Sequence, residues 1–339
     1  MKLKLLTAAL GLSVAGGTVG VASAQTLQET QDRGSVRCGV NTGLAGFSSQ
    51  DDAGEWTGLD VDYCRAVAAA IFDDPAAVTF SPLSAVQRFP ALQNSEVDIL
   101  SRNTTWTMDR DTNLGMVFAG VNYYDGQGFM VREDLGVTSA LELSGATVCV
   151  QSGTTTELNL ADYFASNNLE YNPVVIEQQA DALAAYDSQR CDAFTTDASG
   201  LAASRLELGE PDAHIILPEI ISKEPLGPSV RQGDFEWFGI AKWVHFAMLN
   251  AEELGINQGN LDEMLESENP DVRRLLGLDG DFGAAIGLPN DWAVRIIRHV
   301  GNYGESFERN VGSETPLGIA RGQNALWTDG GLQYAPPVR

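Results

Sequence analysis

Hydrophobic and polar residues alternate over residues 36–40, which is the pattern of a half-buried strand. A glycine-rich turn and a run with helical spacing over 61–72 follow, and two further strand-like runs, 78–82 and 97–100, enclose a second helical run. Strands that alternate with helices favour a parallel sheet with right-handed crossovers. The first part of the chain is therefore predicted to form a βαβαβ unit.

The same pattern starts again in the middle of the chain. A strand at 146–151 leads through a turn rich in glycine and threonine into a helix, and a short strand at 174–176 precedes a helix over 180–188. The next strand, 191–194, ends at Thr195-Thr196-Asp197. This region is predicted to form a second α/β unit.

Two extended stretches, 122–131 and 222–233, connect the two units. Two crossings between the units make the middle segment an insert between two parts of one lobe. The sequence therefore predicts an α/β fold of two Rossmann-like lobes joined by a two-strand hinge. A strongly apolar helix over 235–254 and helical pieces after Gly255 predict a helical C-terminal extension.

The start of the chain has the features of a cleavable signal peptide. Lys2 and Lys4 form a positive n-region, residues 5–21 are apolar, and Ala22-Ser23-Ala24 is a cleavage site before Gln25. No cysteine follows the cleavage point, so a lipid anchor is not expected, and no later run is long and apolar enough to span a bilayer. The remaining 339 − 24 = 315 residues are expected to form a soluble periplasmic protein with room for two domains.

The predicted boundaries divide the chain into a signal peptide over 1–24, the first part of lobe 1 over 25–125, lobe 2 over 126–227, and the second part of lobe 1 with the C-terminal extension over 228–339. In the extension, apolar residues from Trp292 to Phe307 keep helical spacing behind an N-cap at Asn290 or Asp291. Residues 322–339 have no periodicity and are predicted to pack as an irregular strap.

The chain is strongly acidic. Its formal net charge of −25 becomes −25 − 2 = −27 when Lys2 and Lys4 leave with the signal peptide. Nucleic acids and anionic membrane surfaces are not expected as partners, because they would repel such a protein. An arginine placed in a buried loop of this chain needs a specific reason to be there.

Four cysteines lie in two groups, Cys38 with Cys64 and Cys149 with Cys191. An even number of cysteines in an exported chain favours disulfides. Three pairings are possible, and the grouping favours Cys38–Cys64 and Cys149–Cys191, one bond in each lobe; buried free thiols are the alternative. No zinc site or cofactor is predicted, because the chain has no Cys-x-x-Cys and its three histidines stand apart.

A candidate ligand site follows the third predicted strand. Residues 102–110 read Arg-Asn-Thr-Thr-Trp-Thr-Met-Asp-Arg, a cluster of hydroxyl, amide and guanidinium groups around one tryptophan. In open α/β sheets, ligands bind beyond the carboxyl ends of the strands, and Arg110 offers a planar fork of donors that matches a carboxylate. The alternative is a solvated loop with a helix N-cap at Thr107 or Asp109.

The second unit carries two comparable positions. Residues 152–157 lead from a strand into a helix, where unpaired N–H groups can bind an anion. The alternative is an ordinary N-cap at Thr154 or Thr155 with Glu157 behind it. Asp197 follows a strand as the 102–110 loop does, with an N-cap for the helix from Ala198 as the alternative.

The chain resembles the polar amino-acid-binding proteins that feed ABC importers, in particular the general L-amino-acid-binding subgroup. The similarity covers essentially the whole mature chain. The segments that carry it are Gly58-Leu59-Asp60-Val61-Asp62, residues 102–110, Tyr123-Tyr124-Asp125-Gly126-Gln127-Gly128, Val150-Gln151-Ser152-Gly153-Thr154-Thr155, Cys191-Asp192-Ala193, Lys223-Glu224-Pro225-Leu226-Gly227 and Ala335-Pro336-Pro337. The resemblance implies a bilobal type II periplasmic-binding fold that closes on its ligand.

The resemblance also implies roles for five residues. Arg110 and Thr105 would hold the ligand α-carboxylate, together with the backbone N–H of Thr155. Asp197 and the backbone carbonyl of Asn103 would accept from the α-ammonium. The chemistry agrees, because an amino acid is a zwitterion and would pair a cation and an anion that are each costly to bury alone.

The side-chain pocket departs from narrower relatives of this family. Leu44 stands where glutamine-type binders have an aromatic residue, and Gln151 stands where they have a lysine. Broad specificity is expected, with Arg102, Trp106 and Gln151 meeting polar or acidic side chains. Phe47 and Ser152 complete the expected ligand-binding set.

The expected partners are an L-amino acid and the permease and ATPase of an ABC importer, with the binding protein itself a monomer. An exported dehydratase for arogenate-like substrates on the same fold is the alternative function. It would need a general acid or base near the leaving group, and no histidine lies in the candidate loops. A sensor ectodomain would need a membrane span or signalling domain that the sequence does not predict.

Overall fold

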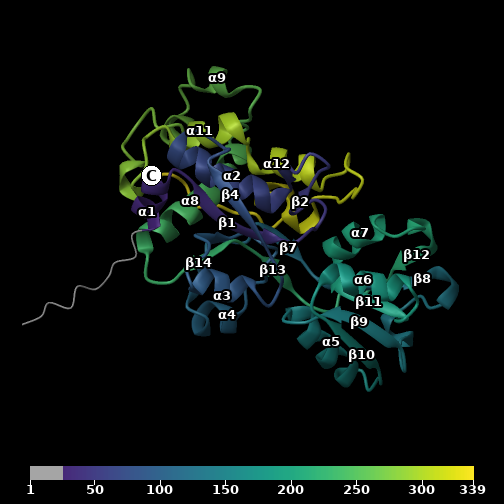
Figure 1. Ribbon diagram of the computed structural model, residues 1–339. Coiled ribbons are helices and arrows are strands. Elements are labelled where there is room, and N and C mark those ends of the chain that lie inside the picture. The colour runs from purple at the N-terminus through teal and green to yellow at the C-terminus, as the bar shows by residue number, and fades with distance from the viewer. Residues whose placement is uncertain (1–25) are drawn as a thin grey trace, which may run out of the picture.

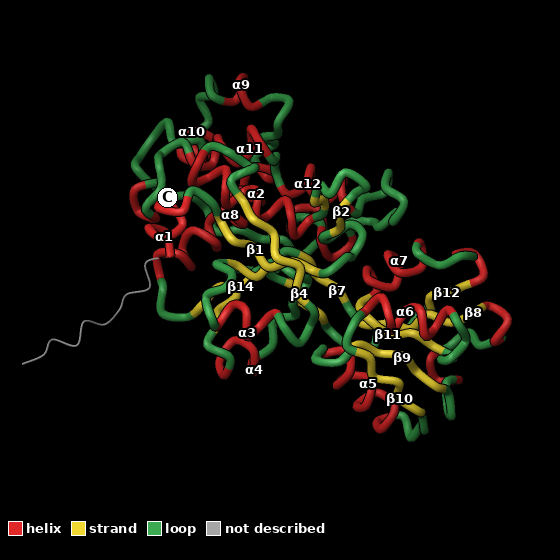
Figure 2. Tube along the Cα trace, viewed as in Figure 1, coloured by secondary structure: helices red, strands yellow, loops and turns green. Residues whose placement is uncertain are grey.

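The computed structural model describes residues 26–339, and the predicted signal peptide, residues 1–24, lies outside the described residues. Figure 1 shows two lobes, each with its own sheet, joined by a narrow crossing. In Figure 2 the strands of each lobe are flanked by helices. The predicted α/β fold with two sheet-containing lobes is confirmed.

The larger lobe, called lobe 1, is built on a five-stranded sheet. Its strands, in spatial order, are β4 (Val78–Leu83), β1 (Val36–Asn41), β5 (Ile99–Leu100), β14 (Ser229–Arg231) and β6 (Met116–Phe118). Strand β1 pairs in parallel with β4 and β5, and helices α2 (Leu59–Phe72) and α3 (Arg88–Gln93) lie in the crossovers between them. This confirms the predicted βαβαβ unit. Strand β14 runs antiparallel to both of its neighbours, and it comes from beyond the second sheet in the sequence.

The other lobe, lobe 2, repeats this plan. Its strands, in spatial order, are β10 (Asn172–Ile176), β9 (Thr147–Gln151), β11 (Ala193–Asp197), β8 (Gln127–Arg132) and β12 (His214–Ile216). Strand β9 is parallel to β10 and β11, while β8 is antiparallel to β11 and β12. The helices of this lobe are α5 (Thr155–Ser166), α6 (Gln179–Asp187) and α7 (Ala198–Leu206).

The hinge is a two-stranded antiparallel ribbon of β7 (Tyr123–Asp125) and β13 (Glu224–Leu226). Its two crossings pass very close to each other at the lobe 1 end, where a Cβ on Gly227 would lie 1.9 Å from the carbonyl oxygen of Gly120. Only glycine permits such an approach of two backbones. The predicted two-strand hinge is therefore confirmed.

The core of lobe 1 is formed largely by residues from the second half of the chain. Helix α8 (Phe235–Glu253) ends one residue before the predicted end and buries Trp237, whose indole Nε1 donates to the Asp98 carbonyl at 3.0 Å. Helices α11 (Trp292–His299) and α12 (Tyr303–Asn310) pack with α2 and α8. No helix among residues 26–339 is long and apolar enough to cross a membrane.

The apolar residues predicted at helical spacing from Trp292 to Phe307 are divided between two helices, α11 and α12. Gly301 adopts a φ of 94°, and Asn302 begins a new helix with a reciprocal capping box to Glu305. The predicted N-cap Asp291 precedes α11, but its side chain makes no capping hydrogen bond. The tail, with 3₁₀ turns η5 (Gly322–Asn324) and η6 (Trp327–Asp329), has the predicted irregular path.

Short elements complete the fold. They are α1 (Thr26–Arg33), β2 (Ser49–Gln50), β3 (Trp56–Thr57), α4 (Met108–Asn113), η1 (Glu133–Leu135), η2 (Ala140–Glu142), η3 (Pro211–Ala213), α9 (Leu261–Met264), α10 (Pro270–Leu275) and η4 (Ala284–Ile286).

Both disulfides form in the favoured pairing. Cys38 in β1 bonds to Cys64 in α2, and Cys149 in β9 bonds to Cys191 just before β11. Within the described residues there are no free cysteines. Each bond therefore ties neighbouring elements of one lobe together and leaves the hinge unlinked.

Candidate ligand-binding site

A buried carboxylate in helix α2, Asp60, holds the loop that follows β5. Asp60 accepts from the backbone N–H of Asn103 at 2.7 Å and from the Ser101 hydroxyl at 2.9 Å. Burial raises the pKa of Asp60, and these hydrogen bonds oppose that effect. Asn103 itself has a φ of 34°, a conformation that asparagine tolerates better than most residues. These hydrogen bonds hold the loop against helix α2.

Arg110 is held at the start of α4. Thr107 is the N-cap and accepts from the Arg110 backbone N–H at 3.2 Å, which settles the two N-cap candidates in favour of Thr107. The guanidinium donates through Nη1 to the Thr105 carbonyl at 2.9 Å and lies over the Phe89 ring at 5.1 Å. Burial lowers the pKa of Arg110, while Glu224 and Asp197 raise it.

Two further arginines are buried in the same region, Arg102 and Arg88, with 1% and 2% of their surface exposed. Arg102 donates to the Leu83 carbonyl at 3.0 Å and to the Asn103 side-chain oxygen at 3.2 Å. Burial lowers the pKa of Arg102 to about 10, and burial with the nearby charges of Arg102 and Arg110 lowers the pKa of Arg88. Among residues 26–339, Arg88 Nε and Arg102 Nη2 have no hydrogen-bond partner. Lobe 1 thus presents a concentrated positive charge in an acidic chain.

Sequence reasoning missed Arg88. It lies at the first position of α3, between apolar residues whose spacing predicted only a helix. Its Nη2 lies 3.5 Å from the Gly153 carbonyl oxygen in lobe 2, so it reaches across the boundary between the lobes. No signal in the sequence marks it, because the helical pattern around Arg88 gives no sign that this side chain is buried.

In lobe 2 the loop after β9 leads directly into α5. Thr154 is the N-cap, accepting from the Glu157 N–H at 3.2 Å, and the Glu157 carboxylate accepts from Gly153 N–H at 3.0 Å. The Gln151 side chain is buried and donates to the Glu177 carbonyl at 3.0 Å, while the Ser152 N–H donates to the Ile176 carbonyl. Thr155 is thereby left at the first helical turn, where backbone N–H groups lack helical acceptors.

Asp197 is the last residue of β11, so the strand extends through the polar exit predicted to follow it. It stands at the N-cap position of α7, but its side chain makes no capping hydrogen bond there. The Asp125 carboxylate accepts from the Ser199 N–H and hydroxyl instead. Burial raises the pKa of Asp197 well above its usual range, and the nearby carboxylates of Asp125 and Glu224 add to this effect. The charges of Arg88 and Arg110 act in the opposite direction.

Arg110 in lobe 1 and Asp197 in lobe 2 lie close enough for the charge of each to shift the pKa of the other. Each is buried, with 7% of its surface exposed. Among the ion pairs of residues 26–339, none joins these two side chains. The arrangement places a cation and an anion within electrostatic reach but leaves each without a direct ionic partner.

A second residue that sequence reasoning missed is Glu224, in hinge strand β13 and 1% exposed. Its Oε2 accepts from the hydroxyls of Thr105 at 2.6 Å and Thr155 at 2.9 Å. Its Oε1 accepts from Asn159 and Ser222, both at 2.7 Å. Hydroxyls from both lobes therefore meet at one hinge carboxylate.

The remaining predicted residues lie at different places. Leu44 and Phe47 are buried in the core of lobe 1, where Phe47 packs edge-on against Tyr123 with ring centroids 5.1 Å apart. Trp106 stacks on Phe118 at 5.3 Å, is 38% exposed, and donates its backbone N–H to Pro225 in the hinge. A ligand role for these three side chains stays a prediction.

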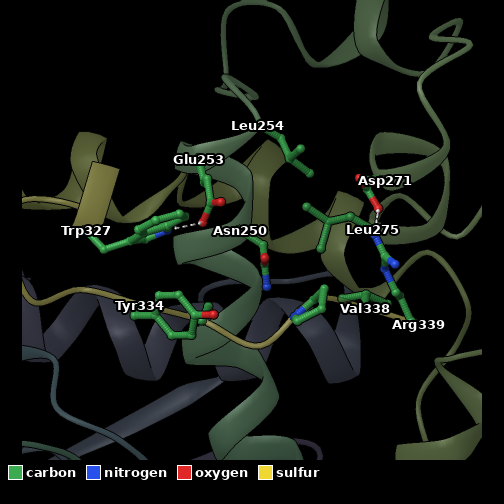
Figure 3. Close-up of a pocket in the computed structure, with 11 residues that line it drawn as sticks. Asn250, Glu253, Leu254, Asp271, Leu275, Trp327, Tyr334, Val338 and Arg339 are labelled. Carbon is green, nitrogen blue, oxygen red and sulfur yellow. Dashed lines mark hydrogen bonds and ion pairs between the residues drawn. The ribbon is translucent and has the colours of Figure 1, made fainter. Parts of the chain in front are cut away.

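A separate pocket, drawn in Figure 3, lies on lobe 1 between α8, α10 and the C-terminal tail. It contains none of the predicted ligand-binding residues. In the described part of the chain, no group of His, Cys, Asp and Glu could hold a metal ion.

Comparison with known proteins gives concordant matches. Residues 36–286 match the model for bacterial extracellular solute-binding proteins, family 3. The chain is 62% identical to the general L-amino acid-binding periplasmic protein AapJ of Rhizobium johnstonii over 100% of both chains. It is 54% identical to the glutamate/glutamine/aspartate/asparagine-binding protein BztA of Rhodobacter capsulatus over 97% of each.

A solved structure extends the match to three dimensions. An ABC transporter/periplasmic binding protein from Brucella ovis with glutathione bound is 62% identical, with a TM-score of 0.92 over 93% of this chain and 100% of that one. These relatives are solute-binding proteins rather than enzymes, in agreement with the predicted absence of catalysis. The chain therefore belongs to family 3 of the bacterial extracellular solute-binding proteins.

Proposed function

We propose that this protein captures L-amino acids between its two lobes in the periplasm and delivers them to the permease and ATPase of an ABC importer. The observation that carries the proposal is a buried guanidinium in lobe 1, Arg110, and a buried carboxylate in lobe 2, Asp197, which act on each other electrostatically but form no ion pair within residues 26–339. A zwitterion between them would neutralise both. In this proposal, lobe 1 consists of residues 25–125 and 228–339, and lobe 2 consists of residues 126–227.

Each end of the ligand would have its own set of partners. Arg110 and the backbone N–H of Thr155 would hold the α-carboxylate, and Thr105 would join them if its hydroxyl turned from Glu224 to the ligand. Asp197 with the Asn103 carbonyl would hold the α-ammonium. The two sets draw on both lobes, so the full set of contacts requires the lobes to approach. Closure would therefore be driven by differential binding to the closed state, as a hinge motion.

Broad specificity that includes acidic and amide side chains is supported by the spare donors of lobe 1. Arg88 Nε and Arg102 Nη2 are buried without partners, and a buried donor gains most from an added acceptor. The relatives named for acidic amino acids and their amides fit this class. Glutathione, bound in the Brucella ovis relative, carries an α-ammonium and α-carboxylate on its γ-glutamyl end and presents the same head group.

Isothermal titration of the mature protein with the twenty amino acids and with glutathione tests the proposal. Several amino acids should bind, and Arg110→Ala should abolish binding of all of them, because they share the α-carboxylate. Arg65→Ala is a matched control, since Arg65 lies in lobe 1 over the Phe80 ring and away from the site. Binding of a single amino acid would refute the breadth, and undiminished binding by Arg110→Ala would refute the site.

The dehydratase alternative and the state of assembly are tested separately. A spectrophotometric assay for phenylpyruvate with an arogenate-like substrate should give no product, because the facing carboxylate, Asp197, is assigned to an ammonium. Light scattering should give the mass of a monomer with and without ligand.

A further inference from the structure

Residues 287–339 lie beyond the segment that matches the family model, and they return to lobe 1. Helix α12 is fixed to α2 through Asp62, whose Oδ2 accepts from the Ser306 hydroxyl and from Asn310 Nδ2, both at 2.7 Å. The tail is fixed to α8, where Asn250 Nδ2 donates to the Pro336 carbonyl at 2.9 Å; Figure 3 shows Asn250 on that helix beside the tail. Both ends of this segment are therefore anchored on lobe 1.

Between these two anchors the segment forms hydrogen bonds with hinge strand β7. Asn324, 4% exposed, accepts from the backbone N–H of Tyr124 at 2.7 Å and donates to the Tyr124 carbonyl at 3.1 Å. One side-chain amide thus satisfies both backbone groups of the middle residue of β7. This is the pair of bonds that a residue of a third strand would make.

The geometry of the ribbon explains why these groups are available. Tyr124 lies opposite Pro225, and since proline has no N–H, the two residues do not exchange backbone hydrogen bonds. In such a pair of an antiparallel ladder, the N–H and carbonyl of Tyr124 point to the outer edge of the ribbon. On the opposite edge, the Pro225 carbonyl accepts from the Trp106 N–H at 2.7 Å, and Thr105 bridges to Leu226. The hinge therefore lies between the candidate ligand loop and the C-terminal segment.

The neighbours of Tyr124 are held as well. The Tyr303 hydroxyl donates to the Asn122 carbonyl at 2.9 Å and accepts from Gln333 Nε2 at 3.2 Å, deep in the core. The Tyr123 ring stacks on Phe307, with centroids 6.1 Å apart. Three consecutive residues of this crossing are thereby bound by the C-terminal segment.

We infer that the whole segment 287–339, and not only the tail at 322–339, acts as a strap that fixes hinge strand β7 to lobe 1. The strap thereby sets ligand affinity, and Asn324 and Tyr303 are its positioning residues. A hinge that is ordered before binding loses less conformational freedom when the lobes close. Release of the strap leaves every ligand contact in place but makes closure more costly. The ligand should therefore bind more weakly.

Two variants test the strap. Asn324→Ala removes both bonds to Tyr124, and Tyr303→Phe removes one hydroxyl and keeps the ring, so that a folded variant is available. Hydrogen exchange without ligand should speed up at the Tyr124 amide in Asn324→Ala and across residues 122–125 in both variants. Titration calorimetry should then show Kd raised about fivefold in Asn324→Ala, the factor for one net hydrogen bond, and less in Tyr303→Phe.

Asn310→Ala is the matched control, because it removes a bond of the same length between the same segment and lobe 1 without touching the hinge. It should leave both hinge exchange and Kd unchanged. Unchanged exchange in the two strap variants, or an equal rise of Kd in Asn310→Ala, would overturn the inference. The affinity measurement rests on the proposed function, whereas the exchange measurement needs no ligand, so failure of one does not imply failure of the other.

Discussion

Lobe 1 and lobe 2 place polar groups at equivalent positions, the carboxyl ends of β5 and β11, but give them opposite charge. The exit from β5 leads to a region with three buried arginines, and the exit from β11 ends in the buried carboxylate of Asp197. The shared topology provides the two positions, and the side chains decide what each can bind. A pair of similar folds thus becomes a site for a ligand with two different ends.

The lobes also differ in how they are stabilised. Lobe 2 is made from one continuous stretch of chain, whereas lobe 1 takes β14, α8 and the C-terminal helices from beyond it. Each lobe carries a single disulfide between neighbouring elements. Four kinds of substitution test these differences between the lobes. In decreasing order of expected free-energy change, they alter the opposing charges, the disulfides, a carboxylate in the hinge, and a buried donor without a partner.

The largest effect is expected from the opposing charges. Arg110→Lys keeps a cation but loses the planar fork, while Asp197→Asn removes the anion; because a buried charge left without its partner is costly, Asp197→Asn should weaken amino-acid binding by a factor of a thousand or more, about 4–5 kcal/mol. Arg110→Lys should cost less. Calorimetric Kd values measure both. Equal, small losses would mean that the two lobes do not share one ligand.

The disulfides should rank by loop length. They close loops with sequence separations of 26 residues in lobe 1 and 42 in lobe 2. The chain-entropy relation gives about 3.5 and about 4 kcal/mol, so Cys149→Ala with Cys191→Ala should cost slightly more than the lobe 1 pair. Urea unfolding followed separately in each lobe measures this. A larger loss from the lobe 1 pair would show that native packing outweighs loop closure.

Asp125 should make stability depend on pH. Burial raises its pKa from 3.8 to about 6, with the Ser199 hydrogen bonds opposing and Glu224 adding to the shift. Between these values the folded chain holds a proton that the unfolded chain has released, so stability falls as pH rises from about 4 to 6, by up to about 3 kcal/mol, and stays lower above it. The difference in unfolding free energy between Asp125→Asn and the unaltered protein should grow through that window and then level off. Parallel pH profiles would contradict this origin.

The smallest effect is expected from a spare donor. Arg88→Ala should weaken binding of glutamate and aspartate about tenfold and leave alanine or serine nearly unchanged, because only acidic side chains would use its unpaired Nε. Competition binding with a labelled amino acid measures the ratio. A uniform loss for all ligands would instead place Arg88 with the α-carboxylate.

Much of the fold follows from the local pattern of apolar residues, most clearly in helix α8, whose buried residues recur every three or four positions. The half-buried strand predicted at 36–40 is wrong in its burial, because β1 lies between β4 and β5 and only Arg37 is partly exposed. Strand β9 and helix α2 are likewise buried at nearly every position. The break at Gly301 does not follow from the apolar pattern, since apolar residues continue at helical spacing on both sides and only the glycine's conformation interrupts them. The cysteines could be paired from the sequence because the two members of each pair lie in the same lobe.

The site was less predictable for a physical reason. Thr105 stands in a polar loop, and Arg110 and Thr155 stand in the first turns of helices that follow such loops, so the break in the apolar pattern marks them in the sequence. Arg88 lies within a helix and Glu224 within a hinge strand, where the pattern predicts structure and gives no sign of a buried charge. Glu224 binds Thr105 and Thr155 together only because the folded chain brings these distant segments to the hinge.

Lobe 1 is built from two separate parts of the chain, so its core is completed late when the chain is synthesised from the N-terminus. All strands of lobe 2 precede residue 217, whereas β14 and Trp237 in α8 come later. During synthesis lobe 2 can finish its sheet while lobe 1 still displays apolar residues that await the last third of the polypeptide. A chaperone that keeps the nascent chain from aggregating would therefore be needed chiefly for lobe 1.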